Sequence, residues 1–211
     1  MRLVAASRER RAVDITHDLS EVTLEIVLRA IFGASYEQLV AVANPFALLT
    51  AESARDLKFA YAFRQLGGVL QQEIQQRRAS PAGADDILQV LIDARDRHTG
   101  APMPDRQIRD EVFTLIVAGH ETTASALSWT WYLIARHPSV AERIRAEVDG
   151  AGSEARDAPD AARFPYVHQV IAESLRLYPP GWLLTRRARS ATSIADVAVD
   201  AGDDVLISPY L

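Results

Sequence analysis

Two neighbouring residues in the middle of the chain, Glu121 and Thr122, are the strongest candidates for chemistry. A carboxylate beside an alcohol can relay protons to a ligand held against it, which is a form of general acid–base catalysis. Neighbours on a helix point about 100° apart, so Thr122 would face a ligand groove with Ala118 while Glu121 points toward a side channel. Taken alone, the pair also fits a capped kink with a solvated glutamate.

His120 comes directly before this pair and invites a zinc-protease interpretation. That motif needs a second histidine four residues after the first, so that both ligands share one helix face. Position 124 is alanine, which excludes it.

Two further groups of charged residues follow later in the chain. Glu173 and Arg176 lie three apart and would form an ion pair on one helix face, worth about 0.2–0.5 kcal/mol in its simplest form. Their apolar neighbours predict partial burial. Arg186 and Arg187 are either solvated cations or an anchor for an anionic ligand group, because arginine suits bidentate carboxylate contacts.

The element that must position Glu121 and Thr122 is a long helix over residues 105–137. Asp105 follows Pro104 as an N-cap, and Pro138 cannot continue the helix. The segment AGHETT is expected to weaken or bend it, since an interior glycine costs about 1 kcal/mol relative to alanine and the two threonine hydroxyls can bond to the carbonyls four residues back, on Ala118 and Gly119. Its small residues would let a flat ligand approach the backbone.

The remaining pattern is mainly helical and ends in a small hairpin. We expect a capping box of Asp18 and Glu21 in the first helix. The helix that Asp85 and Asp86 open is expected to bury Ile87, Val90, Leu91 and Ala94. Strand-like alternation over residues 196–208 surrounds the turn at 200–203. The expected elements are helices over residues 14–32, 52–78, 85–94, 105–137, 138–150 and 165–178, with a weaker segment over 34–50.

Composition limits the function classes. The chain has 211 residues, is near half hydrophobic, has a net charge of −5 and contains no cysteine, so disulfides and thiolate sites within it are excluded. No basic patch with interleaved aromatics suggests nucleic acid. The apolar run of residues 113–135 contains His120 and Glu121, so no transmembrane segment is expected. Without a signal sequence at the N-terminus, we expect a cytoplasmic protein.

Three motifs in order give the chain a resemblance to a known family. AGHETT is similar to the (A/G)-G-x-(D/E)-T-T segment, and ESLR to the E-x-x-R helix, of the cytochrome P-450 haem-thiolate monooxygenases. The tail RRARS…VDAGDDVLISPYL and the early segment DLSEVTLEIVLRAIFG also resemble that family. The resemblance implies a single, partial cytochrome P-450-like domain over residues 1–211, mainly α with a small β hairpin near the C-terminus.

The resemblance also implies roles for the central residues. Ala118 and Gly119 would lie against the haem face. Thr122 would hydrogen-bond the bound dioxygen, and Glu121 would help to deliver protons for O–O cleavage. The implied activity is oxidation of a small organic or lipid-like substrate with haem, dioxygen and NAD(P)H, supplied through an electron-donor protein or reductase domain.

Later residues receive roles in the same way. Arg186 would contact a haem propionate, with Arg187 as the fallback, and Glu173 with Arg176 would tie their helix to a later loop. No metal ligand is assigned, because the family uses a cysteine in a loop beyond the E-x-x-R helix. His120 could ligate iron in principle, but the resemblance would place it on the helix at the opposite side of the haem. The 211 residues alone are therefore expected to be an inactive central fragment without stably bound haem. The alternative is a non-catalytic helical remnant that binds a partner or lipid.

Overall fold

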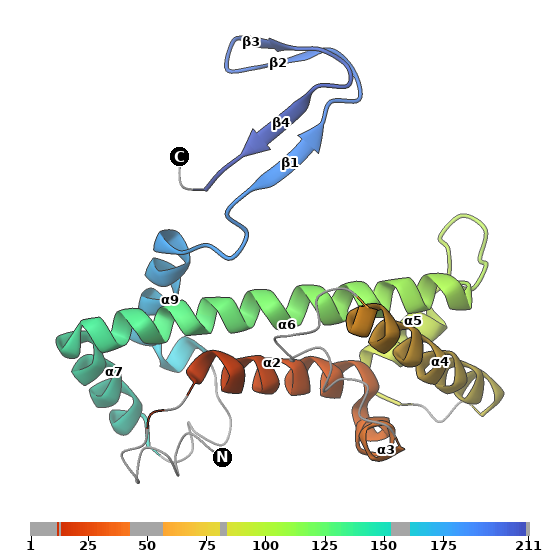
Figure 1. The fold of residues 1–211 in the computed structure, drawn as a ribbon, viewed down its shortest axis with the longest axis horizontal. Helices are drawn as coiled ribbons and strands as arrows, with labels where there is room; N and C mark the ends of the chain where they lie inside the picture. The colour runs from red at the N-terminus through yellow and green to blue at the C-terminus, as the bar shows by residue number, and fades with distance from the viewer. Residues whose placement is uncertain (1–11, 13, 43–56, 81–83, 153–160, 210–211) are drawn as a thin grey trace. The chain divides into compact units, whose positions relative to one another are not determined.

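The fold is mainly helical, with short antiparallel strands near the C-terminus, as predicted (Figure 1). The computed structural model describes residues 12, 14–42, 57–80, 84–152 and 161–209. The chain divides into two compact units, Met1–Ala124 and Ser125–Leu211. The elements are α2 (Ile15–Phe32), η1 (Gly33–Ser35), α3 (Tyr36–Val42), α4 (Leu57–Ala79), α5 (Ile87–Asp93), α6 (Asp105–Arg136), α7 (Pro138–Gly150), η3 (Ala161–Arg163), α9 (Pro165–Leu177), β1 (Leu184–Arg187), β2 (Thr192–Ile194), β3 (Val197–Val199) and β4 (Asp204–Ile207).

Helix α2 begins one turn earlier than its predicted capping box. The Asp14 carboxylate accepts hydrogen bonds from the backbone N–H groups of Thr16 (2.9 Å) and His17 (3.4 Å), so it is the N-cap. The capping box of Asp18 and Glu21 is wrong because Asp18 already lies within the first helical turn. The helix ends at Gly33, whose φ of +51° suits glycine.

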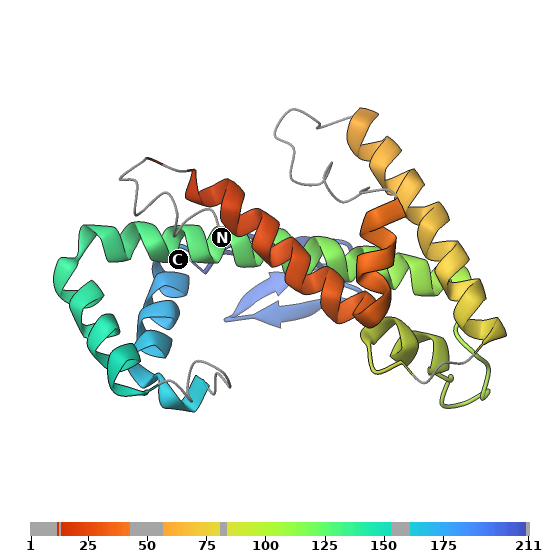
Figure 2. The ribbon, with the colours of Figure 1, turned by 90° about the horizontal axis from the view of Figure 1, so that it is seen from below.

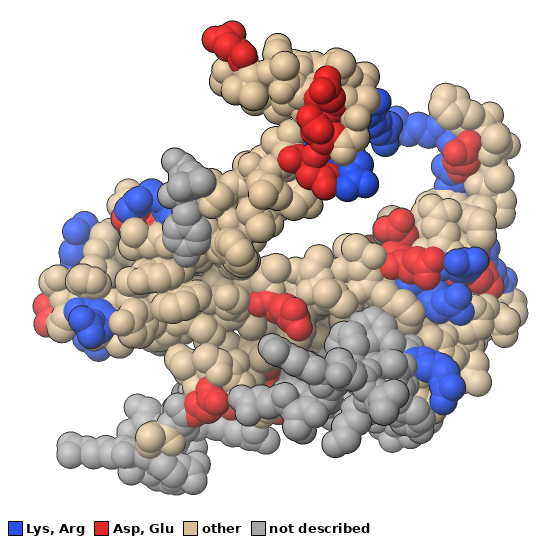
Figure 3. Space-filling model, turned by 45° about the horizontal axis from the view of Figure 1, so that its top comes forward, with Lys and Arg blue, Asp and Glu red and all other residues tan. Residues whose placement is uncertain are grey.

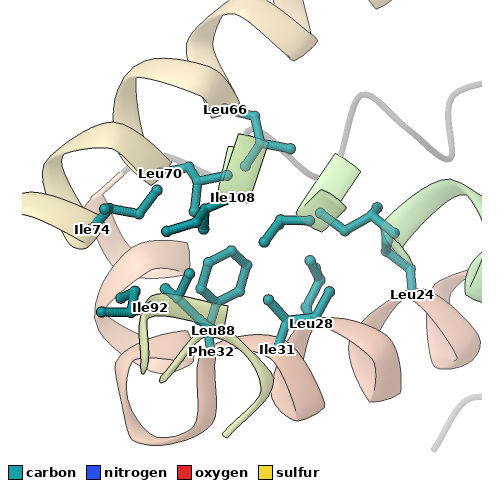
Figure 4. Packing of buried hydrophobic residues seen from close by; sticks show 12 residues of the cluster. Leu24, Leu28, Ile31, Phe32, Leu66, Leu70, Ile74, Leu88, Ile92 and Ile108 are labelled. Atoms are coloured by element: carbon teal, nitrogen blue, oxygen red, sulfur yellow. The ribbon is translucent and has the colours of Figure 1, made fainter. Parts of the chain in front are cut away.

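The core of the first unit joins α2, α4, α5 and the first part of α6 (Figures 2 and 4). Helix α5 presents Leu88 and Ile92 to this core, and Leu91 packs partly against it as predicted, while the predicted burial of Ile87 and Val90 is wrong because both are exposed. The reason is that Asp86 is the N-cap and fixes where the first turn starts. The fully buried apolar residues of the cluster are Leu28, Ile31, Phe32, Leu66, Leu70, Ile74, Leu88, Ile108, Val112 and Ile116.

A buried ionic network closes one side of this core. The Arg77 guanidinium donates to Glu73 and to Asp86, each at 2.7 Å, and to the carbonyl of Phe32 at 3.2 Å. Burial opposes the charged form, yet the two carboxylates raise the pKa of Arg77. The network therefore links α4, α5 and the end of α2.

The long central helix is confirmed, and it continues without a break through AGHETT, where the sequence predicted a flaw. The predicted N-cap is wrong, because Asp105 is the first helical residue and its carboxylate accepts bonds from Gln71 and Arg78 instead. Helix α6 runs from Asp105 to Arg136, one residue short of the predicted end. Helix α4 begins at Leu57 among the described residues, and the earlier part of its predicted range lies outside them.

In the second unit, α7 holds the start of α9. The Glu147 carboxylate accepts the backbone N–H groups of Tyr166 (2.8 Å) and Val167 (2.9 Å), which a helix start leaves without internal partners. Pro165 fits the first position because it has no N–H to satisfy. A buried bond of 2.9 Å between the hydroxyls of Thr130 and Ser174 then ties α9 to α6.

The strands pair differently from the predicted hairpin. Strand β3 pairs with β2, through a turn in which Ala195 and Asp196 have positive φ, and β4 pairs with β1 (Figure 1). The predicted pairing of residues 197–199 with 205–207 is therefore wrong. The stretch 200–203 connects two separate two-stranded sheets.

Candidate functional site: the AGHETT turn of α6 and the E-x-x-R helix

The predicted catalytic pair lies on an exposed face of α6. Ala118, Glu121 and Thr122 are all exposed within the first unit. The Thr122 hydroxyl donates to the carbonyl of Ala118 at 2.6 Å, as the threonine pattern predicted. Because a hydroxyl has one hydrogen and two lone pairs, this arrangement leaves acceptor capacity toward a ligand. The turn thus presents an alcohol, a carboxylate and a methyl group on open surface.

Gly119 faces α2, where its hydrogen is required by packing. A Cβ at this position would lie 2.9 Å from Cγ2 of Val27, closer than real Cβ atoms come to other heavy atoms. The glycine therefore has a structural reason that is independent of any ligand. Its contact with a haem face stays a prediction.

His120 lies on the buried side of the same turn and is 4% exposed. Its Nε2 is 2.8 Å from Oγ of Ser20, and its carbonyl accepts a bond of 3.3 Å from the Thr23 hydroxyl. Burial lowers the pKa of His120, and the nearby Glu121 carboxylate partly opposes this. Among the residues that the structure describes, no group of three or more metal-binding side chains gathers.

Glu173 and Arg176 form the predicted ion pair. Nε and Nη2 of Arg176 donate to the two carboxylate oxygens of Glu173, each at 2.7 Å, and this lowers the pKa of Glu173. Both side chains are more than half exposed, so the predicted partial burial is wrong. Helix α9 buries Ser174 instead, and Arg176 lies two residues, or about 200°, around the helix from it.

The two arginines of β1 differ in their partners. Arg187 makes a bidentate pair with Asp204 of β4, with both distances 2.8 Å. Arg186 is exposed and donates to the carbonyl of Thr185 at 2.8 Å, and no carboxylate among the described residues pairs with it. Arg186 is therefore the more available cation of the two, and its contact with a haem propionate stays a prediction.

The contacts of Ser20, Thr23 and Val27 behind the turn were missed by the sequence analysis. These residues recur at spacings of three and four and so share one face of α2. The spacing predicts that these three residues share a helix face, but it does not predict which helix packs against that face.

Comparison with known proteins decides the family. The family model for Cytochrome P450 matches residues 37–211. The chain belongs to the cytochrome P450 family. Cyclooctatin synthase of Streptomyces melanosporofaciens is 34% identical over 96% of this chain and 48% of its own length. Pentalenene oxygenase of Streptomyces avermitilis is 29% identical over 99% of this chain and 46% of its own length.

Solved cytochrome P450 structures agree with this assignment. The crystal structure of CYP102L1 superposes with a TM-score of 0.78 and 26% identity, and the match covers 99% of this chain and 50% of that one. The chain spans about half the length of the relatives that it matches.

The surface gives two further facts. On the face that Figure 3 shows, acidic and basic side chains lie in small groups separated by wide uncharged stretches. Within the described part of the chain, every helix is too short or too polar to cross a bilayer.

Proposed function

We propose that these residues form the dioxygen side of a haem-dependent monooxygenase. In the proposed reaction one atom of dioxygen enters a C–H bond of an organic substrate and the other leaves as water. NAD(P)H supplies two electrons through an electron-donor protein or reductase domain. The observation that carries the proposal is the exposed group of Ala118, Glu121 and Thr122 on α6 of a cytochrome P450 chain.

The residues at this turn fit one face of a haem. Ala118 is small and exposed, so a flat macrocycle can approach the backbone, and Thr122 keeps acceptor capacity beside it. Bound haem supplies the redox centre at which dioxygen is activated. Thr122 would orient a proton-bearing oxygen, Glu121 would hold the proton to be delivered, and Arg186 would bind a propionate.

A cysteine thiolate for the iron is not available within these residues. The 211 residues contain no cysteine, and the imidazole Nε2 of His120 is engaged with Ser20 on the buried side of α6. A thiolate, which favours O–O cleavage, would therefore come from sequence outside these residues.

The substrate class that we propose is a small, apolar organic or lipid-like molecule. The relatives include proteins named cyclooctat-9-en-7-ol 5-monooxygenase and pentalenene oxygenase. We propose that the protein acts in the cytoplasm.

A second candidate function is a non-catalytic helical module that binds a partner or lipid. Exposed apolar side chains in the second unit favour it, including Trp131, Trp182 and Leu206.

Isotope labelling separates the two functions. A haem-loaded protein that carries these residues together with a cysteine ligand loop would be given cyclooctat-9-en-7-ol as probe, NAD(P)H, an electron donor and ¹⁸O₂. We expect one ¹⁸O atom in the product and the second in water. Product oxygen derived from water, or the absence of oxygenated product for this probe and for a panel of apolar hydrocarbons, would contradict the monooxygenase.

A further inference from the structure

We propose that Ser20, Thr23 and Val27 of α2 form a positioning stripe. The stripe fixes how closely the AGHETT turn of α6 packs against α2, and so where the Thr122 side chain lies. The stripe contacts His120 and Gly119 and touches neither Glu121 nor Thr122 in the bonds described. These are positioning residues, because they act through the turn. The proposal rests on the proposed function, since it assigns the stripe a role in the work of Thr122.

The three members of the stripe make three different contacts. Oγ of Ser20 lies 2.8 Å from Nε2 of His120. The Thr23 hydroxyl has a single hydrogen, which it shares among the carbonyls of Leu19 (2.9 Å) and Ser20 (3.2 Å) on its own helix and, at the longest distance of 3.3 Å, that of His120. Val27 fills the space that a side chain on Gly119 would need. A side-chain bond, a longer shared contact to the backbone and a close approach thus act on two adjacent residues of α6.

Burial makes these contacts specific. Thr23 is 3% exposed, His120 is 4% exposed and Ser20 is partly buried, so water has little access to these polar atoms. A buried polar group that loses its partner costs more than the bond itself contributes. The turn therefore has a favoured position against α2, at which the Ser20–His120 bond forms and Val27 contacts Gly119.

The packing of the turn against α2 determines the position of the Thr122 hydroxyl, because the stripe and Thr122 lie on opposite faces of α6. His120 and Thr122 are two residues apart, about 200° around the helix, so the stripe lies behind the exposed hydroxyl. A change in how deeply the turn sits moves the Thr122 hydroxyl and its acceptor Ala118 together. Misplacement of about 1 Å at a reacting centre can cost roughly a hundredfold in rate.

Amide exchange in the 211-residue chain tests the contact without haem. We expect Ser20→Ala and His120→Leu to speed exchange at the amides of residues 119–124 roughly two- to tenfold, the effect of losing one net hydrogen bond. His120→Gln, whose amide nitrogen reaches a position close to Nε2, should restore protection. The matched control is Thr114→Ala, because the exposed Thr114 hydroxyl bonds only within α6, to the Asp110 carbonyl. Uniform acceleration across α2, α4 and α6 would overturn the proposal, because it would indicate a general loss of stability.

Coupling in a haem-loaded protein that carries these residues tests the functional half. The quantity is hydrogen peroxide released per NAD(P)H consumed, compared for Thr122→Ala, Ser20→Ala, Ser20→Thr and Thr114→Ala. We expect Thr122→Ala and Ser20→Ala to raise it at least about twofold, and Ser20→Thr and Thr114→Ala to leave it near the parent value. An increase for Thr122→Ala without one for Ser20→Ala would overturn the stripe and leave the proposed function standing. No increase for either variant would overturn both.

Discussion

The imidazole of His120 is buried two residues from an exposed catalytic candidate, and its titration has a consequence for stability. Burial lowers the pKa of His120 below the usual value of 6.5. The unfolded chain then binds more protons than the folded chain as the pH falls below about 6.5. The stabilisation from neutral His120 is therefore complete above pH 6.5 and is lost progressively below it.

Urea unfolding between pH 8 and pH 5 measures this contribution. We expect the free energy of unfolding of the parent chain to fall on acidification more steeply than that of His120→Gln, which has no imidazole to protonate. Parallel pH profiles for the two proteins would contradict the burial of a neutral imidazole.

Gly119 provides a second prediction at the residue scale. Gly119→Ala should destabilise the chain by about 1–2 kcal/mol, because overpacking against Val27 outweighs the gain in helix propensity of about 1 kcal/mol. Val27 yields little, since β-branched side chains are stiff at χ1. Thermal unfolding measures the change, and the double variant Gly119→Ala/Val27→Ala should recover part of it. A stabilised Gly119→Ala would show that α2 does not press on this turn.

Among the elements, α9 depends on a cap supplied by another helix. Glu147→Gln should weaken both bonds to the Tyr166 and Val167 amides and the favourable interaction of a carboxylate with a helix N-terminus, at a cost of about 1 kcal/mol. Amide exchange at these two positions should accelerate. The exposed Glu142 of the same helix provides the control, Glu142→Gln, for which no change is expected. Equal effects for the two variants would contradict the cap.

Helix boundaries were largely readable because caps and prolines act locally. Pro138, Pro165 and Gly33 each mark an observed boundary. Strand pairing was not readable, since residues 197–199 and 205–207 alternate equally well whichever partner they take. The strong turn at Ala195 and Asp196 lacks the usual Asn-Gly or Asp-Gly signal and passed unnoticed.

In the candidate site, too, contacts within one helix were predicted from the sequence and contacts between helices were not. The Thr122 bond to Ala118 and the Glu173–Arg176 pair follow from helical spacing and were predicted. The exposure of the ion pair, the packing of Gly119 on Val27 and the Ser20–His120 bond depend on which helix lies opposite. Tertiary partners of that kind leave no signal in local sequence.

At the scale of the whole molecule, the chain belongs to the cytochrome P450 family, carries Glu121 beside Thr122 and contains no cysteine. We therefore expect the 211 residues, supplied with haem, reductant and carbon monoxide, to lack the spectrum of thiolate-ligated haem. The reduced, carbon-monoxide-bound difference spectrum checks this. Its appearance would mean that another residue supplies an equivalent ligand.

The functional account depends on the claim that Thr122 hydrogen-bonds the bound dioxygen and so helps to direct protons to it. The direct measurement is hydrogen peroxide released per NAD(P)H consumed, in a haem-loaded protein that carries these residues, for Thr122→Ala against Thr114→Ala. Both variants remove a hydroxyl that bonds four residues back on α6. We predict that Thr122→Ala diverts electrons from product to peroxide while Thr114→Ala does not. Unchanged coupling in Thr122→Ala would contradict the account.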